Sequence, residues 1–145
     1  MIALAQAVTM IDTALKHGRE KGLQPLTVAV LDAAGCLVAL QRQDGSSLLR
    51  PQIAQAKAWG ALGMGMGTRA LAQRAASHPA FMSALSALSD GRIVPVPGGV
   101  LIRSSTRAVI GAVGISGDHS DHDEACAIAG IEAAGFTADS GQPIP

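Results

Sequence analysis

The sequence predicts a soluble α+β domain with a mainly antiparallel sheet, and three observations support this prediction. Runs rich in Val, Ile and Leu come in two groups, and only short turns separate the runs within a group, which is typical of hairpins. Helical patterns precede, separate and follow these groups. Strands and helices do not alternate one by one, as a doubly wound parallel sheet requires. The length of 145 residues suits a single domain.

The first elements are an amphipathic helix and a hairpin. The helix is expected over residues 4–21 and ends at Gly22, because apolar residues recur at helical spacing. These apolar residues are Leu4, Val8, Ile11 and Leu15. Two β-rich runs over residues 27–31 and 36–40 follow, and a short turn that ends at Gly35 joins them. This arrangement predicts a hairpin.

Helical patterns occupy the middle of the chain. Helices are expected over residues 51–64, 69–76 and 80–88, with Thr68 as the cap of the second. The motif Gly63-Met-Gly65-Met-Gly67 separates the first two helices. It differs from a nucleotide-binding loop, because a helix precedes it and no Lys follows, so we interpret it as a structural joint.

The last third of the chain is predicted to hold three strands and one helix. Strands are expected over residues 92–96, 100–103 and 108–116, and a helix over 121–134. Residues 137–145 are polar and contain proline, so we expect a loosely held C-terminal tail there. Residues 1–136 then form a single domain.

Composition limits the classes of function. Basic and acidic residues number eleven each, so no positive surplus exists to neutralise phosphates, and nucleic-acid binding is not expected. The N-terminus lacks the basic region of a signal peptide and carries Asp12 within its apolar pattern, which predicts a cytoplasmic protein with no membrane association. Hydrophobic residues are 48% of the chain and charged residues only 15%, which favours an oligomer with buried surface.

The densest polar cluster is Gly117-Asp-His-Ser-Asp-His-Asp-Glu124. Its acidic residues fall near the start of the last helix, where the helix dipole favours negative charge, so one interpretation is a capped, solvated helix start. In a second interpretation, His119 and His122 supply nitrogen ligands, and Asp118 or Asp121 supplies oxygen, to zinc or iron. A third is an anion or cofactor site at the helix start. The sequence leaves these open.

Isolated polar residues have structural and functional interpretations as well. His17, at the end of the first helix, suits the helix dipole, but imidazole is also the commonest axial ligand of haem. Arg42 and Lys57 form either salt bridges or ligand contacts. Asp32 serves either the turn or acid–base chemistry. The glycine series of the 108–116 strand and its end indicates either close packing or approach to a planar ligand.

Five segments in order make the chain similar to the GlcG/HbpS family over residues 4–134. They are Pro25-Leu-Thr-Val-Ala-Val-Leu-Asp-Ala-Ala-Gly35, Arg42-Gln-Asp-Gly45, Ala54-Gln-Ala-Lys-Ala58, Val94-Pro-Val-Pro-Gly-Gly-Val100, and Val109-Ile-Gly-Ala-Val-Gly-Ile-Ser-Gly117 with Asp123-Glu-Ala125. The family includes haem-binding and haem-degrading proteins and the domain fused to PduO-type cobalamin adenosyltransferases. It also includes small proteins of glycolate, propanediol and glycerol operons.

The resemblance implies a profilin-like fold, with a five-stranded antiparallel sheet flanked by helices on both faces. It also implies a homo-oligomer, such as an octamer, and a haem or corrinoid ligand. The candidate cofactor-binding residues are then His17, Arg42, Lys57, Gly98, Gly99, His119 and His122. The chain departs from the family at Leu101, where a Pro is usual, and in its charged Asp118–His122 loop.

Three functions are consistent with these observations. The leading hypothesis is a cytoplasmic oligomeric accessory protein that binds a tetrapyrrole, haem or corrinoid, in bacterial catabolism of diols, glycerol or a hydroxy acid. A second is an enzyme acting on a small organic acid or aldehyde, with Asp32 or a histidine as general base. A third is an interaction or reactivation partner of a cobalamin-dependent enzyme.

Overall fold

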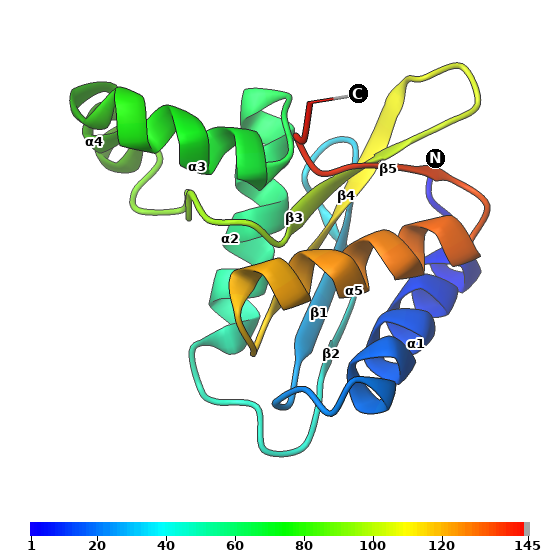
Figure 1. The fold of residues 1–145 in the computed structure, drawn as a ribbon. Coiled ribbons are helices and arrows are strands. Elements are labelled where there is room, and N and C mark those ends of the chain that lie inside the picture. The colour runs from blue at the N-terminus through cyan, green and yellow to red at the C-terminus, as the bar shows by residue number, and fades with distance from the viewer. Residues whose placement is uncertain (144–145) are drawn as a thin grey trace.

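A computed structural model describes residues 1–143 of the chain (Figure 1). The last two residues of the predicted tail, 144–145, lie outside this description. In chain order the elements are α1 (Leu4–Glu20), β1 (Thr27–Asp32), β2 (Leu37–Arg42), α2 (Arg50–Met64), α3 (Thr68–Ser77), α4 (Pro79–Leu88), β3 (Gly99–Arg103), β4 (Val109–Ser116), α5 (Ser120–Ala133) and β5 (Thr137–Asp139). Every helix predicted from the sequence is present, with bounds that differ by one or two residues.

The five strands form one sheet in the order β2-β1-β4-β3-β5, and each neighbouring pair is antiparallel. Helices α1 and α5 cover one face of this sheet and α2 covers the other (Figure 1). The predicted α+β class, the antiparallel five-stranded sheet and the helices on both faces are thus confirmed.

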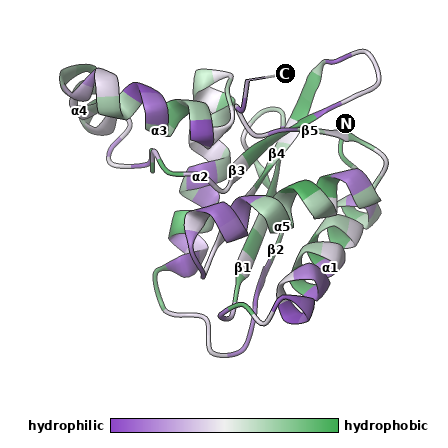
Figure 2. Cartoon of the chain, in the orientation of Figure 1, coloured by the Kyte–Doolittle hydropathy of each residue, from purple (hydrophilic) through white to green (hydrophobic). Residues whose placement is uncertain are grey.

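Alternation along the central strands supplies both hydrophobic layers. On one face, Val113 and Ile115 of β4 pack with the buried residues of α1 and α5. On the other face, Ala112 packs with Ala58 and Ala61 of α2. Successive side chains of a strand point to opposite faces, so a strand buried on both faces reads as a continuous apolar run. Figure 2 shows α5 as hydrophilic at its start and hydrophobic along its middle, which lies against this core.

Small residues let the layers approach closely. A Cβ atom placed on Gly114 would lie 1.9 Å from the carbonyl oxygen of Ala54, and one on Gly117 would lie 2.3 Å from that of Pro25. Real Cβ atoms do not reach such distances, so a side chain at either position would push α2 or the Pro25 segment away. The packing interpretation of this glycine series is therefore the one that the structure supports.

The sequence prediction was wrong at two strands and one cap. Residues 92–96 do not form a strand, because Pro95 within the segment and Pro97 after it have no backbone N–H to donate to a strand ladder. The fifth strand is instead β5, which pairs with β3 and holds the Arg103–Asp139 ion pair at 2.8 Å. Residues 137–139 are therefore not part of a loose tail. Gly67, and not Thr68, is the N-cap of α3.

Helices α3 and α4 project from the sheet as an arm (Figure 1). Helix α4 carries no charged residue, and Met82 is its one buried side chain. Phe81 and Leu88 remain 46% and 82% exposed. Within residues 1–143, none of the helices combines the length and hydropathy that a transmembrane span requires.

Candidate functional site

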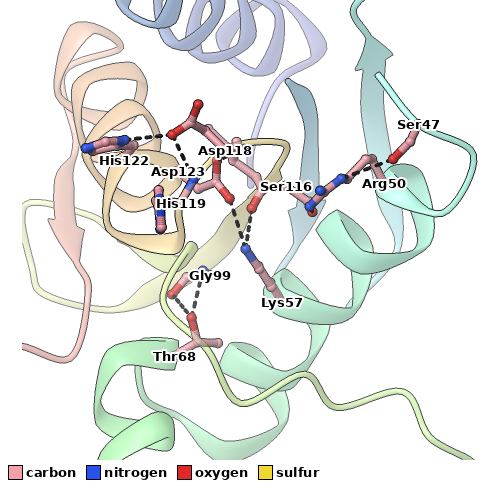
Figure 3. A network of polar contacts seen from close by, with 11 residues as sticks. Ser47, Arg50, Lys57, Thr68, Gly99, Ser116, Asp118, His119, His122 and Asp123 are labelled. Carbon is pink, nitrogen blue, oxygen red and sulfur yellow. Dashed lines mark hydrogen bonds and ion pairs between the residues drawn. The ribbon is translucent and has the colours of Figure 1, made fainter. Parts of the chain in front are cut away.

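The buried centre of the polar cluster is an ion pair that joins α2 to α5. Lys57 Nζ lies 3.3 Å from Asp123 Oδ2 and donates a hydrogen bond of 2.8 Å to the carbonyl oxygen of Ile115 (Figure 3). The two side chains are only 3% and 1% exposed. Burial lowers the pKa of Lys57 and raises the pKa of Asp123, and their mutual attraction opposes both shifts. The Lys57 ammonium thus binds groups of the protein itself, the Asp123 carboxylate and the Ile115 carbonyl oxygen.

Gly98 and Gly99 belong to the surroundings of this lysine. A Cβ atom on Gly98 would lie 2.8 Å from Lys57 Nζ, and one on Gly99 would lie 2.3 Å from the Lys57 carbonyl oxygen. Thr68 Oγ1 accepts a hydrogen bond from the Gly99 amide at 2.8 Å and contacts the Gly99 carbonyl oxygen at 3.2 Å. The two glycines let the start of β3 pass over α2.

A second acid–base pair lies nearby and is more open. Asp118 Oδ1 is 2.7 Å from His122 Nδ1, and Asp118 Oδ2 accepts a hydrogen bond of 2.8 Å from the backbone amide of Gln24. The Gln24 hydrogen bond, and then the His122 contact, lower the pKa of Asp118 to about 2. The carboxylate therefore stays ionised and holds the start of α5 against the segment that follows α1.

The other acidic residues of the helix start are paired with Arg69 of α3. Arg69 Nε lies 2.9 Å from Glu124 Oε2, and its guanidinium also contacts Asp121. The start of α5 is therefore not the solvated helix start of the first interpretation, because Asp123 and Glu124 are both buried. No group of three His, Cys, Asp or Glu side chains within residues 1–143 has an arrangement that would hold a metal ion.

Two of the predicted histidines meet at one cavity. His17, from the last turn of α1, and His122, from the first turn of α5, line a cavity of about 250 Å³ together with Lys21, Leu23 and Ala125. The side chain of His122 is 55% exposed. With its Nδ1–H donated to Asp118, its Nε2 remains free to accept or to ligate. The structure thus brings together residues from opposite ends of the sequence.

His119 lines a separate cavity together with Asp118. This cavity measures about 300 Å³ and includes Gln24 and Arg50 in its lining. The rings of His119 and His122 lie edge to face, with centroids 5.9 Å apart. Arg50 also lies at this cavity and donates hydrogen bonds to Ser47 and Ser116. It was not among the residues predicted from the sequence, because a lone arginine at a helix start belongs to no pattern with a distinctive spacing.

The remaining candidates lie elsewhere. Arg42 is exposed on the edge strand β2 and donates a hydrogen bond of 2.7 Å to the Ser46 carbonyl oxygen. Neither Arg42 nor Lys57 lines the His17–His122 cavity. Asp32 Oδ1 accepts hydrogen bonds from the amides of Ala34 and Cys36, each at 3.0 Å. The turn interpretation of Asp32 is the one that these contacts support.

Comparisons with known proteins agree with this architecture. A family model described as haem-degrading protein HbpS-like matches residues 2–132. The crystal structure of a PduOC–haem complex superimposes with a TM-score of 0.84 at 23% identity, over 97% of this chain and 99% of that chain. The Klebsiella pneumoniae protein ORFY gives 0.83 at 27% identity, over 92% and 90%. HbpS gives 0.78 at 25% identity, over 90% and 88%. No curated protein sequence matches significantly.

Proposed function

This chain belongs to the HbpS-like family of haem-degrading proteins, and from that premise we propose that it is an accessory protein that binds haem at the His17–His122 cavity. One observation carries the proposal. Two imidazoles from separate helices line one cavity, and one of them is oriented by a carboxylate. Histidines that bind metals commonly donate their second ring N–H to such a carboxylate, which fixes the ring and raises its basicity.

The residues present fit an iron tetrapyrrole. Imidazole nitrogen suits iron, and haem would supply an iron centre that accepts an axial ligand. Leu23 and Ala125 give the cavity an apolar surface, and Lys21 adds a cation suited to an acidic side group. At about 250 Å³ the cavity lies below the roughly 300–1,000 Å³ of sites that enclose a drug-sized ligand, so the ligand keeps one side outside.

The family relationship gives independent support. One structural relative is a PduOC–haem complex, and another is HbpS, and both share the fold of this chain over most of its length. A corrinoid is the competing ligand, and its cobalt centre and more heavily substituted ring distinguish it in a binding assay. The exposed apolar helix α4 supports a homo-oligomer as part of the same proposal, because isolated proteins seldom expose a helix without charges. The cytoplasmic location and the link to bacterial catabolism stay predictions.

Titration with hemin, followed through its Soret band, tests this function. We expect saturable binding by the unaltered protein, and a loss of affinity of at least tenfold in His17→Ala and His122→Ala. His78→Ala is the matched control, because His78 is exposed at the α3–α4 junction and does not line the cavity. A cobalamin titration in parallel separates haem from corrinoid. An unshifted Soret band, or equal affinity in all three variants, contradicts the proposal.

A further inference from the structure

A separate cavity lies on the α2 side of the sheet, where the β1–β2 hairpin meets the helix. It measures about 250 Å³. Gln52, Gln55, Ala56 and Trp59 form one wall, because their spacing along α2 places them on one helical face. Leu31, Leu37 and Gly35 of the hairpin, and Arg92 from the segment after α4, complete it. The His17–His122 cavity shares none of these residues.

The charged polar group of this cavity, the Arg92 guanidinium, has no anionic partner in the cavity lining. The Arg92 guanidinium carbon lies 3.9 Å from the Trp59 ring centroid, so it stacks through its face. Stacking leaves the N–H groups at the guanidinium edge available, and they include a fork suited to a carboxylate. Among residues 1–143, Arg92 pairs with no carboxylate and its side chain makes no hydrogen bond. No Asp or Glu lines the cavity.

The indole adds a second donor. A Cβ atom on Gly35 would lie 3.3 Å from Trp59 Cδ1 and 3.5 Å from Nε1, so the pyrrole edge of the ring lies beside Gly35 at the cavity. Gly35 has a φ of +84°, which makes a side chain there doubly unfavourable. The indole N–H can only donate. The site therefore combines an apolar floor, a cation and an N–H donor.

From this arrangement we propose that the Trp59–Arg92 cavity binds a small organic carboxylate with a short apolar body. The carboxylate takes the guanidinium edge and the indole N–H, and the carbon chain lies on Leu31, Leu37 and Ala56. Charge selects the anion, since a neutral analogue gains no ion pair with Arg92. The volume limits the ligand to a small molecule.

The chain provides its own probe. Trp59 is the one tryptophan and the chain has no tyrosine, so excitation of the indole reports binding beside Trp59. Titration with hexanoate should change the Trp59 emission along a saturable curve. Hexanamide has the same shape without the charge, and we expect it to bind at least tenfold more weakly. Hexanoate and hexanamide are compared on the unaltered protein, so a folding defect in a variant cannot obscure the result.

Variants then assign the selectivity to one residue. Arg92→Gln should reduce hexanoate affinity to that of hexanamide, while far-ultraviolet circular dichroism confirms an intact fold. Arg74→Gln is the matched control, because Arg74 is an exposed arginine of α3 outside the cavity. Equal binding of hexanoate and hexanamide, no saturable signal from hexanoate, or an unchanged hexanoate affinity in Arg92→Gln overturns the assignment. Haem binding at the other cavity is independent of each outcome.

Discussion

Two acid–base pairs at the start of α5 differ in burial and consequently in what they do. The Lys57–Asp123 pair is 3% and 1% exposed, and burial shifts the pKa of each group towards its neutral form. The His122–Asp118 pair is 55% and 12% exposed, and the pKa of its carboxylate is instead lowered, to about 2. The two carboxylates lie five positions apart in the sequence. The inner pair holds the layers together, and the outer pair keeps a nitrogen accessible to a ligand.

The largest effect is expected from opening the inner pair. Asp123→Ala leaves the Lys57 ammonium buried without its partner, which costs about 3–5 kcal/mol of unfolding free energy. Urea denaturation measures the loss. The double variant Lys57→Met with Asp123→Leu should recover most of it, because apolar replacements remove the desolvation penalty of both charges. A double variant no more stable than Asp123→Ala contradicts this account.

The next effect concerns the outer pair and rests on haem binding. Asp118→Asn keeps the shape of the side chain but removes the charge that orients His122. Loss of such a supporting partner typically lowers metal affinity about 10–100-fold. Hemin titration of Asp118→Asn measures this change. The same substitution at the exposed Asp44 is a control that should leave hemin affinity unaltered.

Acid should act on the outer pair through Asp118. Its pKa in the folded protein, about 2, is below the ordinary value of 3.8. Stability from this group is therefore fully present above about pH 4 and disappears as the pH falls towards 2. Thermal unfolding across this range should show a shallower loss of stability in Asp118→Asn than in the unaltered protein. Parallel curves for the two proteins are inconsistent with the shifted pKa.

The smallest effect is expected at the solvent-facing contact of the same helix start. Asp121 pairs with Arg69, but their side chains are 73% and 24% exposed. Asp121→Asn should cost about 1 kcal/mol or less in urea denaturation, because exposed ion pairs contribute little and salt screens them. High salt should reduce the difference further. A loss as large as that of Asp123→Ala would show that burial does not separate the two positions.

The sequence predicted those parts of the fold that depend on local pattern. The hairpin, the longest strand and the helices follow from β-branched runs and helical spacing, and their bounds agree closely with the structure. Strand β5 has the sequence Thr-Ala-Asp, which carries no β signal, and it forms because β3 offers a free edge and Arg103 pairs with Asp139. The segment with the sequence Val-Pro-Val-Pro is the opposite case. Its valines predicted a strand, but it forms none, because proline has no backbone N–H to donate to a strand ladder.

The residues of the candidate site could be predicted from the sequence, but their arrangement in space could not. His17 and His122 were both candidates, yet their meeting depends on the packing of α1 against α5, which no local pattern encodes. Lys57 was expected to contact a ligand or form a salt bridge. Its partner Asp123 lies 66 residues away, so sequence spacing does not identify the pair. The burial of Lys57 beside Asp123 favours the salt bridge over the ligand contact.

The position of Lys57 has a mechanical consequence. Its side chain begins on α2, which covers one face of the sheet, and ends on α5, which covers the other, with the end of β4 held between them through the Ile115 carbonyl oxygen. The two outer layers therefore cannot slide independently across the sheet. The first turn of α5, which carries His122, is clamped before any ligand arrives. A haem bound there, as proposed, would meet groups that the protein already holds in place, so less ordering entropy would be lost on binding.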